Sequence, residues 1–244
     1  MTTAGQLQSL LGLQSPPVAV TFQATAPPGV PRIASAGPSS CTYWKRAAEG
    51  QTFYTEASDH HHCPIGAYTH GVDLAPAQAA ELQGVVGMMI KLGYLRSEEV
   101  PGIPRRKEAF GVAVYAPLDD TWPEPDVVLV RGNARQVMLL EEAAQAADVG
   151  GDAGMMGRPT CAALPAVLSS GRGVASLGCI GNRVYTALPD DELYYALPGR
   201  HVAAVVQKLA VVVNANRELE KYHRARNQRS EVGGQRSEVA GEGS

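Results

Sequence analysis

The sequence lacks the features that would assign it to a nucleic-acid, membrane or secreted class. With 21 basic and 24 acidic residues among 244, its formal charge is −3, so we expect no nucleic-acid partner and no electrostatic docking to a membrane. The longest apolar stretch, 202–213, is interrupted by Gln207 and Lys208 and is shorter than the roughly 20 residues that span a bilayer. The N-terminus has neither the basic start nor the apolar run of a secretory signal. These absences predict a soluble cytoplasmic protein.

Several common catalytic and binding motifs are also absent. The sequence contains no Cys-x-x-Cys pair, no His-Glu-x-x-His, no EF-hand loop and no recognisable Ser-His-Asp arrangement. A glycine-rich segment at 150–157 lacks the Gly-Lys-Ser/Thr end of a phosphate-binding loop. We expect it to be a plain flexible loop, with a flexible flap over the site as the alternative, in which Met155 and Met156 serve as soft lids or thioether ligands.

What the chain does have is four cysteines in two matched pairs. Cys41 precedes Cys63 by 22 residues, and Cys161 precedes Cys179 by 18 residues. Cys63 follows His60-His61-His62 and precedes Pro64-Ile65-Gly66, while Cys179 stands between Gly178 and Ile180-Gly181-Asn182-Arg183. Because cytoplasmic thiols stay reduced, metal binding, thiol chemistry or burial is expected for these cysteines rather than disulfides.

The pattern of apolar residues predicts a mixed α/β fold in a single compact unit over residues 1–226. Short β-branched runs bounded by proline or glycine predict strands, and N-capping residues with apolar periodicity predict helices. Gly84 and Gly87 inside the helix opened by Pro76 predict close packing against another backbone. Residues 227–244, in which Gln-Arg-Ser-Glu-Val occurs twice, are expected to form a disordered polar tail. The strands are predicted at 18–22, 52–55, 111–115, 127–130 and 174–177, and the other main helices at 41–48, 133–147 and 199–222.

The order of these parts suggests an internal duplication with halves at about 17–96 and 111–222. Each half contains a buried strand, a cysteine that opens a short helix, a second strand, a cysteine beside a glycine, and a helix opened by proline. Little residue identity joins the two halves. If the duplication holds, a pseudo-twofold axis would bring all four sulfurs together.

Several motifs occur in order between about residues 7 and 222. They are Pro17-Val18-Ala19-Val20, Ser40-Cys41, His62-Cys63-Pro64-Ile65-Gly66, Tyr115-Ala116-Pro117-Leu118, Pro125-Asp126-Val127-Val128-Leu129 and Gly178-Cys179-Ile180-Gly181-Asn182-Arg183. Together they resemble the DUF169 family of uncharacterised prokaryotic proteins, and the resemblance implies one compact α/β unit with no established activity. The four cysteines lie where this family usually has them, whereas the triple histidine and the C-terminal repeats depart from its pattern.

The chemistry of thiolates points to an iron–sulfur cluster held by Cys41, Cys63, Cys161 and Cys179, with zinc or another thiophilic metal as the alternative. Thiol chemistry without metal and ordinary buried cysteines are the competing interpretations. His62 is a candidate further ligand or proton shuttle beside Cys63. We expect His60 and His61 to be exposed to solvent.

Arg183 and Asn182 are candidate substrate-binding residues, since a guanidinium binds anions with two parallel hydrogen bonds. A structural salt bridge is the competing role for Arg183. The leading functional hypothesis is redox or sulfur chemistry on a small molecule or with a redox partner. The alternatives are a non-enzymatic binding protein for a small ligand or metal ion, and a subunit of a larger complex. Whether the protein is an enzyme, and whether it forms homo-oligomers, the sequence leaves open.

Overall fold

A computed structural model describes residues 1–118, 124–151 and 159–239. Its centre is a sheet of six antiparallel strands in the order β2-β3-β1-β4-β6-β5. The mixed α/β fold in one compact unit is confirmed. The strands are β1 (Val18–Gln23), β2 (Phe53–Glu56), β3 (Val112–Pro117), β4 (Val127–Asn133), β5 (Val174–Ser176) and β6 (Glu192–Pro198).

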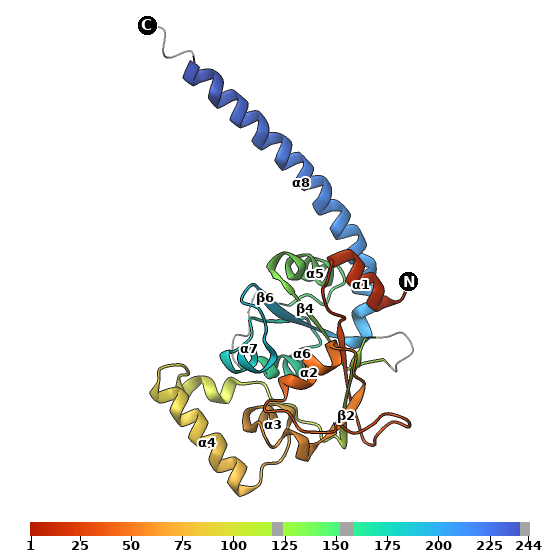
Figure 1. Cartoon of the computed structure of the whole chain (residues 1–244), viewed down its shortest axis with the longest axis vertical. Helices are drawn as coiled ribbons and strands as arrows, with labels where there is room; N and C mark the ends of the chain where they lie inside the picture. The colour runs from red at the N-terminus through yellow and green to blue at the C-terminus, as the bar shows by residue number, and fades with distance from the viewer. Residues whose placement is uncertain (119–123, 152–158, 240–244) are drawn as a thin grey trace.

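One face of the sheet is covered by three helices. In Figure 1 these lie together above β4 and β6, where α5 and α1 both pack on α8. Asn133 caps α5 as predicted, because its side chain accepts the Gln136 N–H at 3.0 Å while Gln136 returns a bond to the Asn133 N–H at 2.8 Å. The helices are α1 (Thr3–Leu11), α5 (Ala134–Ala146) and α8 (Val202–Val239), the last preceded by the short 3-10 helix η4 (Gly199–His201).

The opposite face carries the segments that contain the cysteines. Here α2 packs on α7, and α3 packs on η3 and α6. Trp44 and Tyr43 of α2 are fully buried against the sheet and anchor this layer. The elements are α2 (Cys41–Ala48), the 3-10 helix η1 (Ala57–His60), α3 (Pro64–His70), the 3-10 helix η3 (Thr160–Ala162), α6 (Ala163–Ser170) and α7 (Ile180–Thr186).

Burial on both faces explains why the central strands are continuously apolar. Along β4, Val127 and Leu129 face the layer of α2 and α6, while Val128 and Val130 face the layer of α1, α5 and α8. The residues of β6 alternate between the two cores in the same way. No strand was predicted from the sequence over 192–198.

The strand order bears on the expected duplication. Read from the middle outward, β1-β3-β2 on one side matches β4-β6-β5 on the other, so β3 is the counterpart of β6. The first half then ends with β3, whereas the sequence analysis placed 111–115 in the second half. By the same order, the connection from α3 to β3 corresponds to the connection from α7 to β6. The first contains the helix α4 (Pro76–Lys91) and the 3-10 helix η2 (Ser97–Gly102), whereas the second is short, so α4 and η2 have no counterpart in the second half. The twofold axis itself stays a prediction.

The last helix is longer than predicted. α8 is continuous from Val202 to Val239 and extends away from the body of the molecule (Figure 1), so residues 227–239 have helical backbone here. An isolated polar helix is marginal in water, and the disordered tail therefore stays a prediction for the protein in solution. Within the described residues, no helix has the length and apolar character needed to cross a membrane.

Candidate functional site

All four cysteines line one cavity, which has a volume of about 200 Å³. The cavity lies on the face of the sheet that carries α2, α3, α6 and α7, with α4 on its outer side. Four segments that are far apart in the chain thus contribute one sulfur each. The four cysteines therefore line one cavity, and their joint binding of a ligand stays a prediction.

Two of the cysteines are helix caps. The Cys63 sulfur accepts the backbone N–H of Gly66 at 3.3 Å, and the Cys179 sulfur accepts that of Asn182 at 3.4 Å. Both side chains are half-buried, and each sulfur faces the first turn of its helix. The backbone N–H groups at a helix start favour a thiolate over a neutral thiol.

Each of the two capping cysteines contacts a hydroxyl residue that lies just before one of the other two cysteines in the chain. The Thr160 hydroxyl accepts the backbone N–H of Cys179 at 2.6 Å, and the Cys63 thiol lies 4.0 Å from the Ser39 hydroxyl oxygen. The glycine after Cys63 is required by the packing: a Cβ on Gly66 would lie 3.0 Å from the Cys63 sulfur and 2.8 Å from the Ser40 Cβ. The segment therefore fits only because residue 66 has no side chain.

The remaining two cysteines form a buried pair. Cys41 starts α2 with 3% of its surface exposed, and Cys161 lies in η3 with 4% exposed. Their mutual hydrogen bond lowers the pKa of Cys41 and raises the pKa of Cys161, and burial raises the latter further. Cys41 is thus the more acidic thiol of the pair. Burial likewise raises the pKa of Cys63.

Asn182 is the polar group of the cavity that lacks partners. Its side chain lines the cavity and is 1% exposed, and neither its amide nitrogen nor its amide oxygen has a hydrogen-bond partner in the described residues. The amide nevertheless lies close enough to two neighbours to lower their pKa values through hydrogen bonds, namely the Cys41 thiol and the Tyr194 hydroxyl. Asn182 is therefore a buried neighbour of the cysteine pair.

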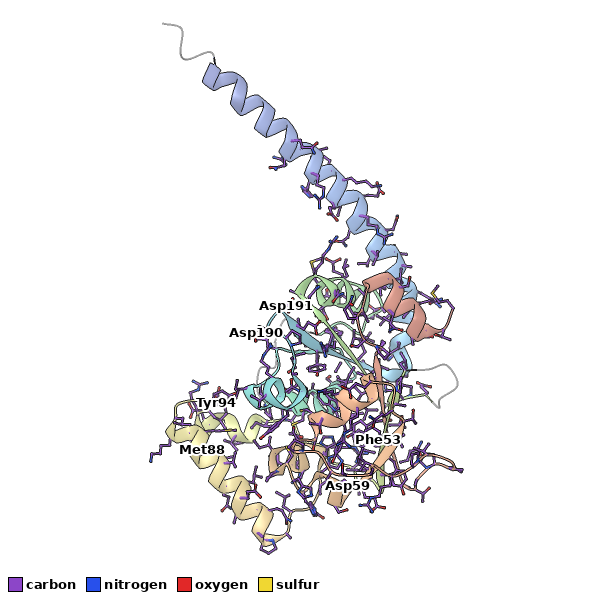
Figure 2. All side chains as sticks on the ribbon, viewed as in Figure 1. Phe53, Asp59, Met88, Tyr94, Asp190 and Asp191 are labelled. Carbon is purple, nitrogen blue, oxygen red and sulfur yellow. The ribbon has the colours of Figure 1, made fainter. Side chains whose placement is uncertain are left out.

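The rest of the cavity wall is apolar. Side chains of α4, of the segment 94–103 and of α7 supply it, and none of the lining residues described is charged. In Figure 2, Met88 marks the α4 side and Tyr94 marks the segment that follows it. The cavity is therefore lined by cysteine sulfurs on one side and by a neutral, apolar wall on the other.

Two further candidates from the sequence lie differently. His62 is exposed and is not among the residues that line the cavity. The Arg183 guanidinium donates to the backbone carbonyls of Leu177, Pro189 and Glu192, at 2.5, 2.6 and 3.2 Å, and lies 3.8 Å from Asp190. Its hydrogen bonds are thus used to hold the turn between α7 and β6, the structural role that competed with substrate binding.

The sequence analysis missed a buried histidine pair behind Cys63. His60 was expected to be exposed but is 1% exposed, because its ring bonds to the hydroxyls of Ser40 at 3.0 Å and Thr55 at 2.9 Å. Its ring centroid lies 4.5 Å from that of His70. Burial lowers the pKa of both histidines, that of His70 to about 4, so both are neutral near pH 7. The only signal in the sequence was the placement of polar residues, such as Ser40 and Thr55, that give the buried rings hydrogen-bond partners.

His70 links this pair to the cysteine cap. Its Nδ1 lies 2.7 Å from the Gly66 carbonyl oxygen, which only accepts, so Nδ1 carries the proton. Nε2 then accepts from the Tyr115 hydroxyl at 3.3 Å. Gly66 therefore donates its N–H to Cys63 and accepts, at its carbonyl oxygen, a hydrogen bond from a neutral histidine.

The described residues contain no group of three or more His, Cys, Asp and Glu side chains arranged to hold a metal ion. A single zinc ion with bonds to sulfur of about 2.3 Å requires sulfurs about 3.8 Å apart. The four sulfurs here instead surround a cavity. As placed, they do not form the compact tetrahedron of a structural zinc site.

Comparison with known proteins adds a family but no activity. Residues 6–208 match the model of the DUF169 family, described as "Uncharacterised ArCR". The chain belongs to the DUF169 family. It is 30% identical over 164 residues to an uncharacterised protein of Methanocaldococcus jannaschii, a match that covers 62% of this chain and 67% of that protein. No solved structure is significantly similar to this DUF169 protein. The resemblance inferred from the motifs is thereby confirmed.

Proposed function

We propose that this protein holds an iron–sulfur cluster through Cys41, Cys63, Cys161 and Cys179, for redox or sulfur chemistry on a small molecule. The observation that carries the proposal is the meeting of all four cysteines of the chain at one cavity. Cysteines scattered through a core by composition alone have no reason to meet at one place. Thiolates are the usual ligands of such clusters.

The arrangement favours a cluster over a single ion. A multinuclear centre fills space between its ligands, whereas zinc needs four sulfurs around a point. Here the Cys41–Cys161 pair, Cys63 and Cys179 line a cavity of about 200 Å³ rather than surrounding a point. Zinc or another thiophilic ion, which would draw the sulfurs inward, is the second candidate.

The surroundings suit a redox centre. The N–H groups of Gly66 and Asn182 point at two of the sulfurs, and hydrogen bonds to ligand sulfurs are one means by which proteins tune reduction potential. The apolar wall of the cavity limits the access of water to the sulfurs. When bound, the cluster would supply electron transfer or a binding position for a soft atom; the residues of this chain hold it, orient its ligands and restrict solvent.

A second function is supported by the apolar wall of the cavity rather than by its cysteines. A neutral, mainly apolar cavity is typical of a binding site for a small apolar ligand, which needs no metal. In that case the cysteines are part of the pocket wall. We place either activity in the cytoplasm, because four free thiols at one site would be oxidised in a secretory compartment.

Single substitutions of the cysteines test the proposal. In anaerobically purified protein, each of the four Cys→Ser variants should lose most of the visible absorption near 400 nm and most of the bound iron. His62→Ala is the control, since His62 is exposed and away from the cavity, and it should keep both. If the wild type binds no iron after reconstitution, or if the four variants keep it, the cluster proposal is wrong and the ligand-binding function takes its place.

A further inference from the structure

Large apolar side chains are exposed on both sides of the cavity. Ile180 and Tyr185 line the cavity from α7, yet they are 63% and 46% exposed, so the cavity reaches the surface of the molecule beside this helix. The helix α4 lines the other side. We call the exposed apolar residues on these two sides the α4–α7 patch, which consists of Met88 and Leu92 on the α4 side and of Leu177, Ile180, Val184 and Tyr185 on the α7 side.

The helix α4 has little support within a single chain. None of its residues is buried, its main contact is with α3, and in Figure 1 it lies at the lower left, outside the layers that cover the sheet. Leu82 and Met89 face the cavity, while Met88 and Leu92 are exposed. A helix that is apolar on more than one side is normally covered by other elements, and a helix of about this length is marginal in water by itself. A further surface is therefore needed for α4 to pack on.

We propose that two copies of this chain pair through the α4–α7 patch, with α4 of one copy packed on α7 of its partner. A twofold axis makes this contact twice, since each copy offers both helices. The pairing also covers the place where each cavity reaches the surface. The inference does not depend on the cluster, because the patch lies outside the sulfurs.

The α4 side of the patch is edged by a positive charge. Lys91 is exposed at the C-terminal end of the helix. Arg96 follows, but its charge is balanced by ion pairs with Glu98 and Glu99 of its own chain. Glu81 is ten residues earlier, about 15 Å along the helix axis from Lys91. The end of α4 that carries the patch is thus positive.

The α7 side of the patch is edged by negative charges. Asp190 and Asp191 are both exposed in the turn after α7. Arg183 joins this turn to the patch, because its guanidinium lies 3.8 Å from the Asp190 carboxylate and also donates to the Leu177 carbonyl. A twofold pairing of α4 on α7 therefore brings opposite charges together at the edge of an apolar contact.

The composition and size of the patch favour a permanent partner. Leu, Ile, Val, Met and Tyr side chains are typical of the apolar centre of homodimer interfaces, and a transient redox partner would leave them in water between encounters. Together the six residues expose the equivalent of about three and a half complete side chains, on the order of 300 Å² of apolar surface. Apolar patches of this size mark interaction sites, and a polar margin completes the roughly 800 Å² that a standard interface takes from each partner.

The experiment measures the molar mass of the full chain by sedimentation velocity across a wide range of concentrations. The wild type should have the mass of two chains. Val184→Glu and Leu92→Glu place a charge within the patch but outside the cavity, and each should weaken pairing at least about a hundredfold. Met138→Glu on α5 and Leu219→Glu on α8 are matched controls, since both residues are exposed and apolar but lie elsewhere, and both variants should keep the mass of the wild type.

Reversal of the edge charges tests the proposed pairing of helices. Lys91→Glu and Asp191→Lys should each weaken association severalfold, and the two together should restore it, because opposite charges again face each other. In iron-free protein, Val184→Glu should also let the half-buried thiols of Cys63 and Cys179 react faster with a thiol reagent. Equal rates in this variant and the wild type would contradict the covering of the cavities.

Several results would overturn the inference. They are a wild type that stays a single chain at every concentration, a dimer that Val184→Glu and Leu92→Glu leave intact, and a dimer that Leu219→Glu dissociates, which would place the contact on α8. Failure of the doubly reversed variant to regain affinity would contradict the contact of α4 with α7. Should one of the two patch variants fail to fold, the other still decides.

Discussion

The neutral histidine pair behind Cys63 makes the folded state sensitive to acid. His70 is fully buried, and burial lowers its pKa to about 4, with the Arg106 guanidinium acting in the same direction and its bond to the Gly66 carbonyl opposing it. In the unfolded chain a histidine has a pKa of about 6.5. Below that pH the unfolded chain binds a proton at His70 that the folded chain does not bind.

The size of the effect follows from the two pKa values. The contribution of His70 is fully present above pH 6.5 or so and is lost progressively as the pH falls toward the folded value of about 4. Between pH 7 and pH 5 the loss is about 2 kcal/mol from this residue alone. His60 acts in the same direction, because burial and its neighbours His70 and His61 lower its pKa as well.

Urea denaturation of the wild type and of His70→Gln at pH 7 and pH 5 measures this loss. The wild type should lose at least about 2 kcal/mol of unfolding free energy, and the variant should lose about 2 kcal/mol less than the wild type does. Equal stability of the wild type at both pH values, or the same pH dependence in the variant, would show that His70 is not held neutral as described.

Four further substitutions test other parts of the account. Gly66→Ala should lower both iron content and melting temperature, because its Cβ would press on Ser40 and on the Cys63 sulfur. Gly84→Ala, where the Cβ meets nothing within 4 Å, should instead raise stability by about 0.5–1 kcal/mol, and equal effects of the two would contradict the packing. Asn133→Ala should cost about 1 kcal/mol in urea denaturation through loss of the capping box, and no cost would refute that role. Arg183→Lys should lower the melting temperature, since a lysine cannot reach three carbonyls; an unchanged melting temperature would contradict the structural role of Arg183.

Much of the fold was predictable because its signals are local. β1, β3 and β4 are short β-branched runs bounded by turn residues, and α2 and α5 begin at the residues that the sequence indicates. β6 was missed because burial on both faces removes the alternation that marks a strand, and acidic residues precede it. α3 and α7 were missed because each has only seven residues and is capped by a cysteine, a residue not among the usual helix caps.

The site was predictable in its sulfurs but not in its surroundings. The spacing of the cysteines suggested that they meet, yet nothing local showed that α4 supplies an oily wall or that His60 is buried between hydroxyl groups. Gly84 and Gly87 were wrongly expected to allow close packing, since no heavy atom lies within 4 Å of a Cβ built at either position. These properties depend on long-range packing. The Met155 and Met156 flap lies outside the described residues.

The central claim is that four cysteines hold one cluster, and iron and acid-labile sulfide per chain measure it most directly. In protein purified without oxygen we expect both in stoichiometric amounts, with all four thiols unreactive toward a thiol reagent until the iron is chelated. A chain with no iron or sulfide, and with its thiols reacting alike before and after attempted reconstitution, would contradict the claim.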